Sequence, residues 1–154
     1  MIDGVITRPL RIIPDARGAV MHMLRNDWPE FAGFGEVYFS CIEPGAVKAW
    51  RRHTQMTMQL AVPAGAVEVV LYDARDASPT YGGVQRQVLS PGSEDSYTLL
   101  IIPPGIWNGF RGVASTTSVV ANCGSIAHAP GEAEGLPADD PQIPFAWPDT
   151  ATGG

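Results

Sequence analysis

Short apolar runs separated by turn residues are the feature that most restricts how this chain can fold. Apolar and β-branched segments of strand length recur from near the start to about residue 123, with Gly, Pro, Asp or Ser between them. The chain contains 17 Gly and 14 Pro, which would interrupt most long helices, and no segment keeps a helical period. We therefore predict an all-β sandwich or barrel, with candidate strands at Glu36 to Ile42, Val47 to Trp50, Gln59 to Val62, Ala66 to Tyr72, Arg86 to Leu89, Tyr97 to Ile102, Ile106 to Gly112 and Thr117 to Asn122.

The length of 154 residues, of which 45% are hydrophobic, is enough for one domain with a core and too short for two. We predict a single domain over residues 1–154, with a barrel up to about residue 123. Residues 124–148 are rich in Pro, Gly, Ala and acidic side chains, which predicts an extended tail laid over the barrel. We expect residues 149–154 to be disordered.

Charge and hydropathy exclude several classes of partner. The net charge is −6, with a pI near 4.9 and scattered basic residues, which argues against nucleic acid or an anionic membrane as the main partner. No apolar run approaches the roughly 20 residues that span a bilayer. The N-terminus lacks the charged start and apolar core of a signal peptide. We therefore expect a cytoplasmic protein.

The stretch from Gly45 to Gly65 resembles the first cupin motif, in which metal ligands lie on neighbouring strands of a small jelly-roll β-barrel. Both glycines fit, but the expected ligand positions hold Arg51, His53 and Met58. A second cupin-like segment ends at Asn108, where a metal cupin would place its third histidine. Arginine does not coordinate divalent metals, methionine suits only soft ions, and an amide oxygen replaces imidazole poorly. We therefore predict a cupin-type barrel with neither metal nor another cofactor.

Several segments in order along most of the chain resemble the dTDP-4-dehydrorhamnose 3,5-epimerase family. The most specific is the Asp-x-Arg-x-x-Ser-Pro-Thr-x-Gly element from Asp73 to Gly82. The resemblance implies a jelly-roll cupin, usually a homodimer, whose family chemistry removes and returns a proton beside a sugar ketone without metal. The other matching segments are Asp15 to Gly18, Gly45 to Trp50, Ile102 to Phe110, and Asp139 to Pro144 with Trp147.

The catalytic positions implied by this resemblance are substituted. The position of the family's base histidine holds Arg51, and the arginine that opens that segment is replaced by Lys48. Met58 stands at a family lysine and Asn108 at a family histidine, while the general-acid tyrosine aligns, across a gap, near His128. The resemblance therefore carries over the fold but not an unchanged epimerase mechanism.

The substituted positions still suggest an acid/base site. Strand alternation places Arg51 and His53 on one face, which in a cupin lines the barrel interior. We predict that His53 is the base or acid and that Arg51 and Lys48 stabilise an anion. Asn108 would supply a hydrogen bond and His128 a possible partner. Further predicted substrate contacts are Arg17, reaching a neighbouring subunit, together with Met58 and Trp107.

Several of these roles have a structural alternative. His53 would equally suit a buried, hydrogen-bonded imidazole, and Arg51 would suit a salt bridge across the barrel to Glu43 or Glu68. Arg17 lies in an Asp-x-Arg-Gly sequence that is also ordinary for a hairpin turn. Met58 would equally suit a position packed in the hydrophobic core.

Two functions follow. The first is an isomerase or lyase of the 3,5-epimerase-like cupin type. It would perform isomerisation, epimerisation, dehydration or cyclisation on a small carbonyl-bearing metabolite. The second is a binding or structural cupin that has lost catalysis.

Overall fold

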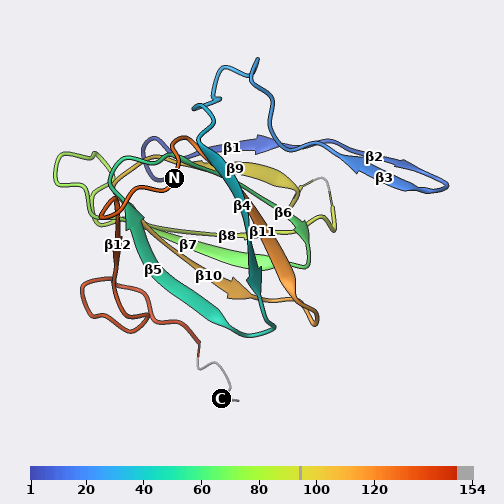
Figure 1. Cartoon of the computed structure of the whole chain (residues 1–154). Helices are drawn as coiled ribbons and strands as arrows, with labels where there is room; N and C mark the ends of the chain where they lie inside the picture. Colours follow the sequence, from blue (N-terminus) through green and yellow to red (C-terminus); the bar gives the residue numbers. More distant parts are fainter. Residues whose placement is uncertain (94, 149–154) are drawn as a thin grey trace.

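The described fold consists of two five-stranded antiparallel sheets packed against each other and a separate two-stranded sheet, β2-β3 (Figure 1). The computed structural model describes residues 1–93 and 95–148; the disorder expected for residues 149–154 lies outside this range. The all-β prediction is confirmed. The described strands are β1 (Ile6–Pro9), β2 (Ile12–Asp15), β3 (Gly18–Met21), β4 (Glu36–Ile42), β5 (Val47–His53), β6 (Met58–Ala64), β7 (Val67–Asp73), β8 (Val84–Leu89), β9 (Thr98–Ile102), β10 (Ile106–Gly112), β11 (Ser118–Gly124) and β12 (Ala133–Gly135).

From β4 to β7, and again from β8 to β12, the chain alternates between the two five-stranded sheets, while β7 and β8 form a hairpin within one of them. One sheet has the strand order β1-β9-β6-β11-β4 and the other has the order β12-β5-β10-β7-β8. The successive pairs β4 and β5, and β6 and β7, are therefore split between sheets that face each other. Gly65 makes the turn from β6 to β7 with φ of 81°. A Cβ atom there would lie 2.2 Å from Oγ of Ser118, so the turn requires glycine.

The predicted strands lie at the right places in the chain, but some of them begin or end at other residues than predicted. β4 and β10 have the expected bounds, whereas β5 continues three residues beyond Trp50 to His53. The strands β1, β2, β3 and β12 were not predicted. They have four, four, four and three residues, so none contains a long apolar run.

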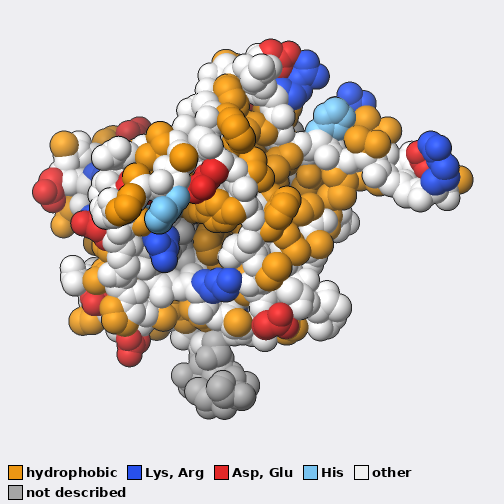
Figure 2. All heavy atoms as spheres, viewed as in Figure 1, with side chains coloured by type: hydrophobic (Ala, Val, Ile, Leu, Met, Phe, Trp, Pro, Cys, Tyr) orange, Lys and Arg blue, Asp and Glu red, His pale blue; other side chains and the backbone are white. Residues whose placement is uncertain are grey.

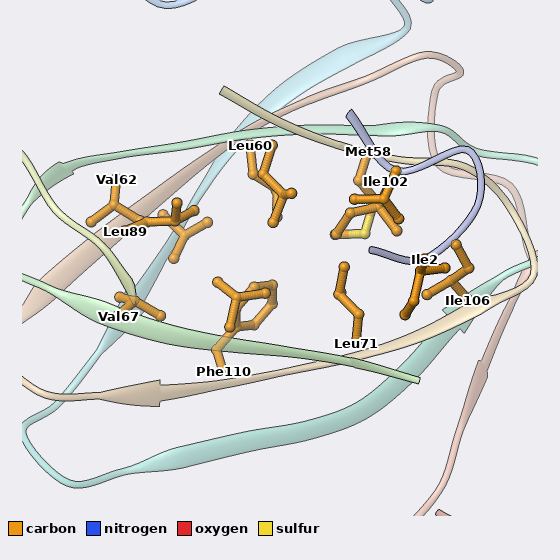
Figure 3. Packing of buried hydrophobic residues seen from close by; sticks show 14 of the residues in the cluster. Ile2, Met58, Leu60, Val62, Val67, Leu71, Leu89, Ile102, Ile106 and Phe110 are labelled. Atoms are coloured by element: carbon orange, nitrogen blue, oxygen red, sulfur yellow. The ribbon is translucent and has the colours of Figure 1, made fainter. Parts of the chain in front are cut away.

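The main core lies between the two sheets (Figure 3). Leu60 and Val62 of β6 point inward from one sheet toward Val67 and Leu71 of β7 in the other. Phe110 of β10 fills the space near them. Burial of these side chains supplies the main driving force for closing the sandwich.

The segment after β12 covers the outer face of the second sheet. Ile143 packs in one cluster with Trp50, Val70 and Trp107, and Trp147 lies against it. The rings of Trp50 and Trp147 have centroids 5.2 Å apart. The C-terminal tail therefore closes a second apolar layer. No helix in the described part of the chain is long and apolar enough to cross a membrane.

Candidate functional site

A cavity of about 430 Å³ opens between the two sheets, where the edge strand β4 faces β5. Figure 2 shows this face hollowed between β5 and β4, with basic side chains beside the hollow. Its apolar wall comes from Leu60, Phe110 and Val120. The remaining lining residues are Tyr38, Ser40, Lys48, Ala49, Trp50, Arg51, Met58, Asn108 and Asn122.

Two basic side chains from β5 give this cavity its charge. Lys48 and Arg51 both line it and both are exposed. Nζ of Lys48 donates a hydrogen bond to Oγ of Ser40 at 3.1 Å. Within residues 1–93 and 95–148, neither basic group lies within ion-pairing distance of a carboxylate. The cavity therefore presents positive charge that an anionic ligand can bind.

The salt bridge considered for Arg51 is not formed. Glu68 instead pairs with Arg86 at 2.8 Å and with Arg111 at 3.3 Å. Burial by itself would raise the pKa of Glu68, but these two arginines outweigh it and lower that pKa. Glu43 accepts hydrogen bonds from the hydroxyl of Thr117. Both carboxylates are therefore engaged away from the cavity.

Asn108, on β10, contacts residues of β5 and β6 that also line the cavity. Its Nδ2 donates to the backbone oxygen of Arg51 at 3.0 Å and contacts Sδ of Met58 at 3.4 Å. Asn108 is opposite Arg51 in the pairing of β10 with β5, next to an irregularity in the register. Three of the four cupin ligand positions thus line the cavity, with guanidinium, thioether and amide groups. This set does not suit a divalent cation.

His53, at the fourth ligand position, lies elsewhere. It is buried and does not line the cavity, so the expectation that His53 and Arg51 face one cavity is wrong. Its Nδ1 is 2.7 Å from Oε1 of Glu132, directly before β12, and β12 pairs with the end of β5. Nδ1 of His53 is thus hydrogen-bonded, as in the structural alternative, whereas its Nε2 is buried without a hydrogen-bond partner in the described structure.

Glu132 is held ionised by its surroundings. Burial would raise its pKa, but the hydrogen bonds from His53 and from the backbone N–H groups of Met56 and Gln55 outweigh it. The pKa of Glu132 is lowered to about 2.

Three other predicted site residues also lie outside the cavity lining. Trp107 packs beneath the C-terminal tail, with the Arg52 guanidinium 4.6 Å from its ring centroid, because its side chain faces the outer layer. His128 is exposed in the loop between β11 and β12. Arg17 lies at the β2–β3 turn, which projects from the body in Figure 1, and pairs with Asp15 at 3.1 Å. A contact of Arg17 with a neighbouring subunit stays a prediction.

Tyr38 and Asn122 were not predicted as site residues. Nδ2 of the buried Asn122 donates to Oη of Tyr38 at 2.8 Å, and both residues line the cavity. The available signal was alternation in β4, which places Tyr38 and Ser40 on the same face, opposite the exposed Val37 and Phe39.

The most specific sequence motif has a structural role outside the cavity lining. The buried carboxylate of Asp73 accepts hydrogen bonds from the Arg75 guanidinium and from the hydroxyls of Ser78 and Thr80. The arginine contact is the main reason that the pKa of Asp73 lies well below its ordinary value. This network fixes the loop after β7.

Potential metal ligands do not cluster in the described structure. Across residues 1–93 and 95–148, no group of three or more His, Cys, Asp or Glu side chains is arranged to hold a metal ion. A metal-independent function therefore stays a prediction based on the side chains at the cupin ligand positions.

Comparison with known proteins gives the context of this cavity. The model of the family described as dTDP-4-dehydrorhamnose 3,5-epimerase matches residues 1–153. A crystal structure of a dTDP sugar isomerase from Desulfovibrio desulfuricans G20 is 49% identical, with a TM-score of 0.91, covering 95% of this chain and 92% of that one.

Two curated relatives also match most of the chain. The spore coat polysaccharide biosynthesis protein SpsL of Bacillus subtilis is 33% identical over 96% of this chain and 97% of its own length. A probable low-salt glycan biosynthesis epimerase, Agl13 of Haloferax volcanii, is 33% identical over 79% of this chain and 77% of its own length. The chain therefore belongs to the dTDP-4-dehydrorhamnose 3,5-epimerase family.

Proposed function

We propose that this protein is a metal-independent enzyme that binds an anionic, carbonyl-bearing sugar in the cavity and interconverts its isomers by proton transfer beside the ketone. The observation that carries the proposal is the pair Lys48 and Arg51, which line the cavity without a carboxylate partner in the described structure. Because the chain belongs to a family described by a dTDP-linked sugar, we propose a nucleotide-linked sugar as the substrate.

The cationic groups match the charge changes of this chemistry. Removal of a proton from the carbon beside a ketone leaves an enolate whose oxygen is negative. Guanidinium and ammonium groups donate to such an oxygen, and loss of one preorganised donor typically costs about 10²- to 10³-fold in rate. Arg51 can also bind two oxygens of a phosphate through its planar fork. We assign enolate or phosphate stabilisation to Arg51 and Lys48, with Asn108 holding β5 in place.

A binding protein without catalysis is the second candidate. It is favoured by the absence of imidazole and carboxylate side chains from the described lining residues. The two functions differ in whether bound sugar exchanges its α protons with solvent. A binding protein takes up the sugar and leaves these protons in place.

The test uses dTDP-4-dehydro-6-deoxyglucose, which differs from dTDP-4-dehydrorhamnose in configuration at C3 and C5. The sugar is incubated with the protein in D₂O and followed by proton NMR. We expect enzyme-dependent loss of at least one signal beside the ketone, and a large reduction of that rate with Arg51→Ala. Binding by calorimetry without enzyme-dependent exchange would support the non-catalytic function instead.

We also propose a homodimer. Edge strand β4 exposes Val37 and Phe39, with 51% and 67% of their surfaces accessible, and such edges pair readily with another chain. Light scattering should give twice the chain mass, and a value near 16.4 kDa at micromolar concentration would contradict the dimer. Cytoplasmic location stays a prediction from the sequence.

A further inference from the structure

The cavity contains few side chains that can transfer a proton. Its titratable lining residues are Tyr38, Lys48 and Arg51, and no imidazole or carboxylate is present among the described lining residues. Arginine stays protonated in proteins and cannot act as the proton carrier. Lys48 is hydrogen-bonded to Ser40 and supplies part of the positive charge proposed to hold the anionic ligand. Tyr38 is the remaining group.

The hydrogen bonds around Tyr38 determine which way its hydroxyl can act. Oδ1 of Asn122 accepts the backbone N–H of Gln59 at 3.0 Å, which fixes the orientation of the amide. Nδ2 of Asn122 therefore faces Tyr38 and donates to Oη at 2.8 Å. Because Oη is the acceptor in this contact, the phenol proton is free to be donated to another group.

The burial of the two residues supports the same arrangement. Asn122 is only 1% exposed, so its amide is held away from bulk water, whereas Tyr38 is 38% exposed at the cavity. A buried donor aimed at the phenol oxygen stabilises negative charge there. The pair is therefore suited to a hydroxyl that releases a proton and later recovers it.

We propose that Tyr38 is the proton carrier of the site and that Asn122 is its positioning residue. This inference rests on the proposed function. The cycle starts with Tyr38 as phenolate, after its proton has passed to solvent at the cavity opening. The phenolate takes the α proton, and the C–H electron pair becomes the enolate. The O–H bond of Tyr38 then breaks, the enolate carbon–carbon π pair forms a C–H bond with the proton, and the O–H electron pair stays on the phenolate oxygen.

The proposed proton carrier, Tyr38, does not lie at either position that the family resemblance indicates for the base and the general acid. The resemblance places the base position at Arg51 of β5, and the general-acid position near the exposed His128. Tyr38 lies on β4, across the cavity opening from β5. Because the carrier sits on one wall, one α position of the sugar is expected to exchange faster than any other.

The first test compares Tyr38→Phe with the unchanged protein in D₂O, using dTDP-4-dehydro-6-deoxyglucose as the probe and proton NMR as the readout. Removal of the hydroxyl should lower kcat for α-proton exchange by roughly 10²-fold or more, with KM changed less than about threefold. Tyr81→Phe is the matched control, because Tyr81 is 58% exposed and lies outside the cavity lining; it should exchange at the unchanged rate.

The second test asks whether Asn122 acts through Tyr38. Asn122→Ala should lower kcat by roughly tenfold in the parent, but by less than about twofold when the Tyr38→Phe substitution is already present. A general structural defect would lower kcat equally in both backgrounds. Circular dichroism and a thermal melt establish that each variant is folded.

The outcomes separate this inference from the proposed function. Exchange by the parent together with undiminished exchange by Tyr38→Phe would overturn the role of Tyr38 and leave the proposed function standing. Equal losses from Asn122→Ala in both backgrounds would overturn its positioning role. No enzyme-dependent exchange by the parent would overturn the proposed catalysis and Tyr38's role together.

Discussion

Nδ1 of His53 lies 2.7 Å from Oε1 of Glu132, which ties the last residue of β5 to the residue before β12. The other carboxylate oxygen accepts the backbone N–H groups of Gln55 and Met56. Glu132 thus replaces part of the sheet hydrogen bonding where β5 ends. A buried carboxylate with these partners is important for stability, because removal of its charge leaves several donors unpaired.

Glu132→Gln should therefore destabilise the protein most at neutral pH. Since the folded pKa is lowered from 4.5 to about 2, the stabilisation is fully present above the unfolded pKa and is lost as pH falls through the folded pKa. We expect a loss of about 3 kcal/mol in the free energy of unfolding at pH 7, shrinking between about pH 5 and pH 2. Urea unfolding across this range measures it.

The control for this change is Glu134→Gln in the neighbouring strand. Glu134 pairs with Arg52 near the surface, and removal of such a pair should cost about 0.5 kcal/mol or less. An equal effect of Glu132→Gln at pH 7 and at about pH 2.5 would show that its charge does not stabilise the fold.

Gly109→Ala should displace the C-terminal tail. A Cβ atom at this position would lie 2.7 Å from Cζ2 of Trp147 and 2.8 Å from Cβ of Ala49. We expect a loss of about 1–3 kcal/mol in unfolding free energy and a changed tryptophan fluorescence spectrum. Gly92→Ala, whose nearest neighbour would be Oγ of Ser90 at 3.4 Å, is the control. Unchanged fluorescence and stability would contradict the packing described for Trp147.

Arg51→Lys should weaken binding of dTDP even though it keeps the charge. Lysine lacks the planar fork that contacts two oxygens at once, so we expect a roughly tenfold increase in Kd by calorimetry, and a larger increase for Arg51→Ala. Arg25→Lys, at an exposed pair with Asp27, should bind like the parent. If the parent, Arg51→Lys and Arg51→Ala bind dTDP with equal affinity, the anion does not bind at Arg51.

The purified protein should carry no stoichiometric transition metal. Arg51, Met58 and Asn108 stand at cupin ligand positions and do not suit divalent cations. Elemental analysis should therefore give well under one equivalent, and EDTA should leave the thermal midpoint unchanged. About one equivalent of metal with His53 among its ligands would contradict this account.

The sequence predicted the architecture better than the site. Apolar runs between glycines and prolines identify β4 and β10, because strand-forming residues and the turn residues beside them are local features of the sequence. Alternation along β5 also placed Arg51 at the cavity, but it assigned His53 to the same space. The partner that holds His53 is Glu132, 79 residues away, and no local pattern reports such a contact.

Tyr38 was missed for the same reason. Its functional context is a hydrogen bond from Asn122, 84 residues later in the chain, on the adjacent strand β11. Alternation in β4 places Tyr38 and Ser40 on one face, but it does not show that Asn122 lies beside the phenol. Family resemblance did not supply it either, because it identified positions on β5 and near His128.

We propose above all that the cavity between β4 and β5 holds the nucleotide-linked sugar with its ketone or a phosphate beside Arg51 and an α carbon beside Tyr38. The most direct measurement is a crystal structure of the Tyr38→Phe variant with dTDP-4-dehydro-6-deoxyglucose, in which turnover should be slow enough to trap the sugar. We predict the ketone or a phosphate oxygen within about 3 Å of the Arg51 guanidinium, and an α carbon within about 4 Å of the edge of the aromatic ring at position 38. A sugar bound outside this cavity, with Arg51 and the ring at position 38 free of contact, would contradict the claim.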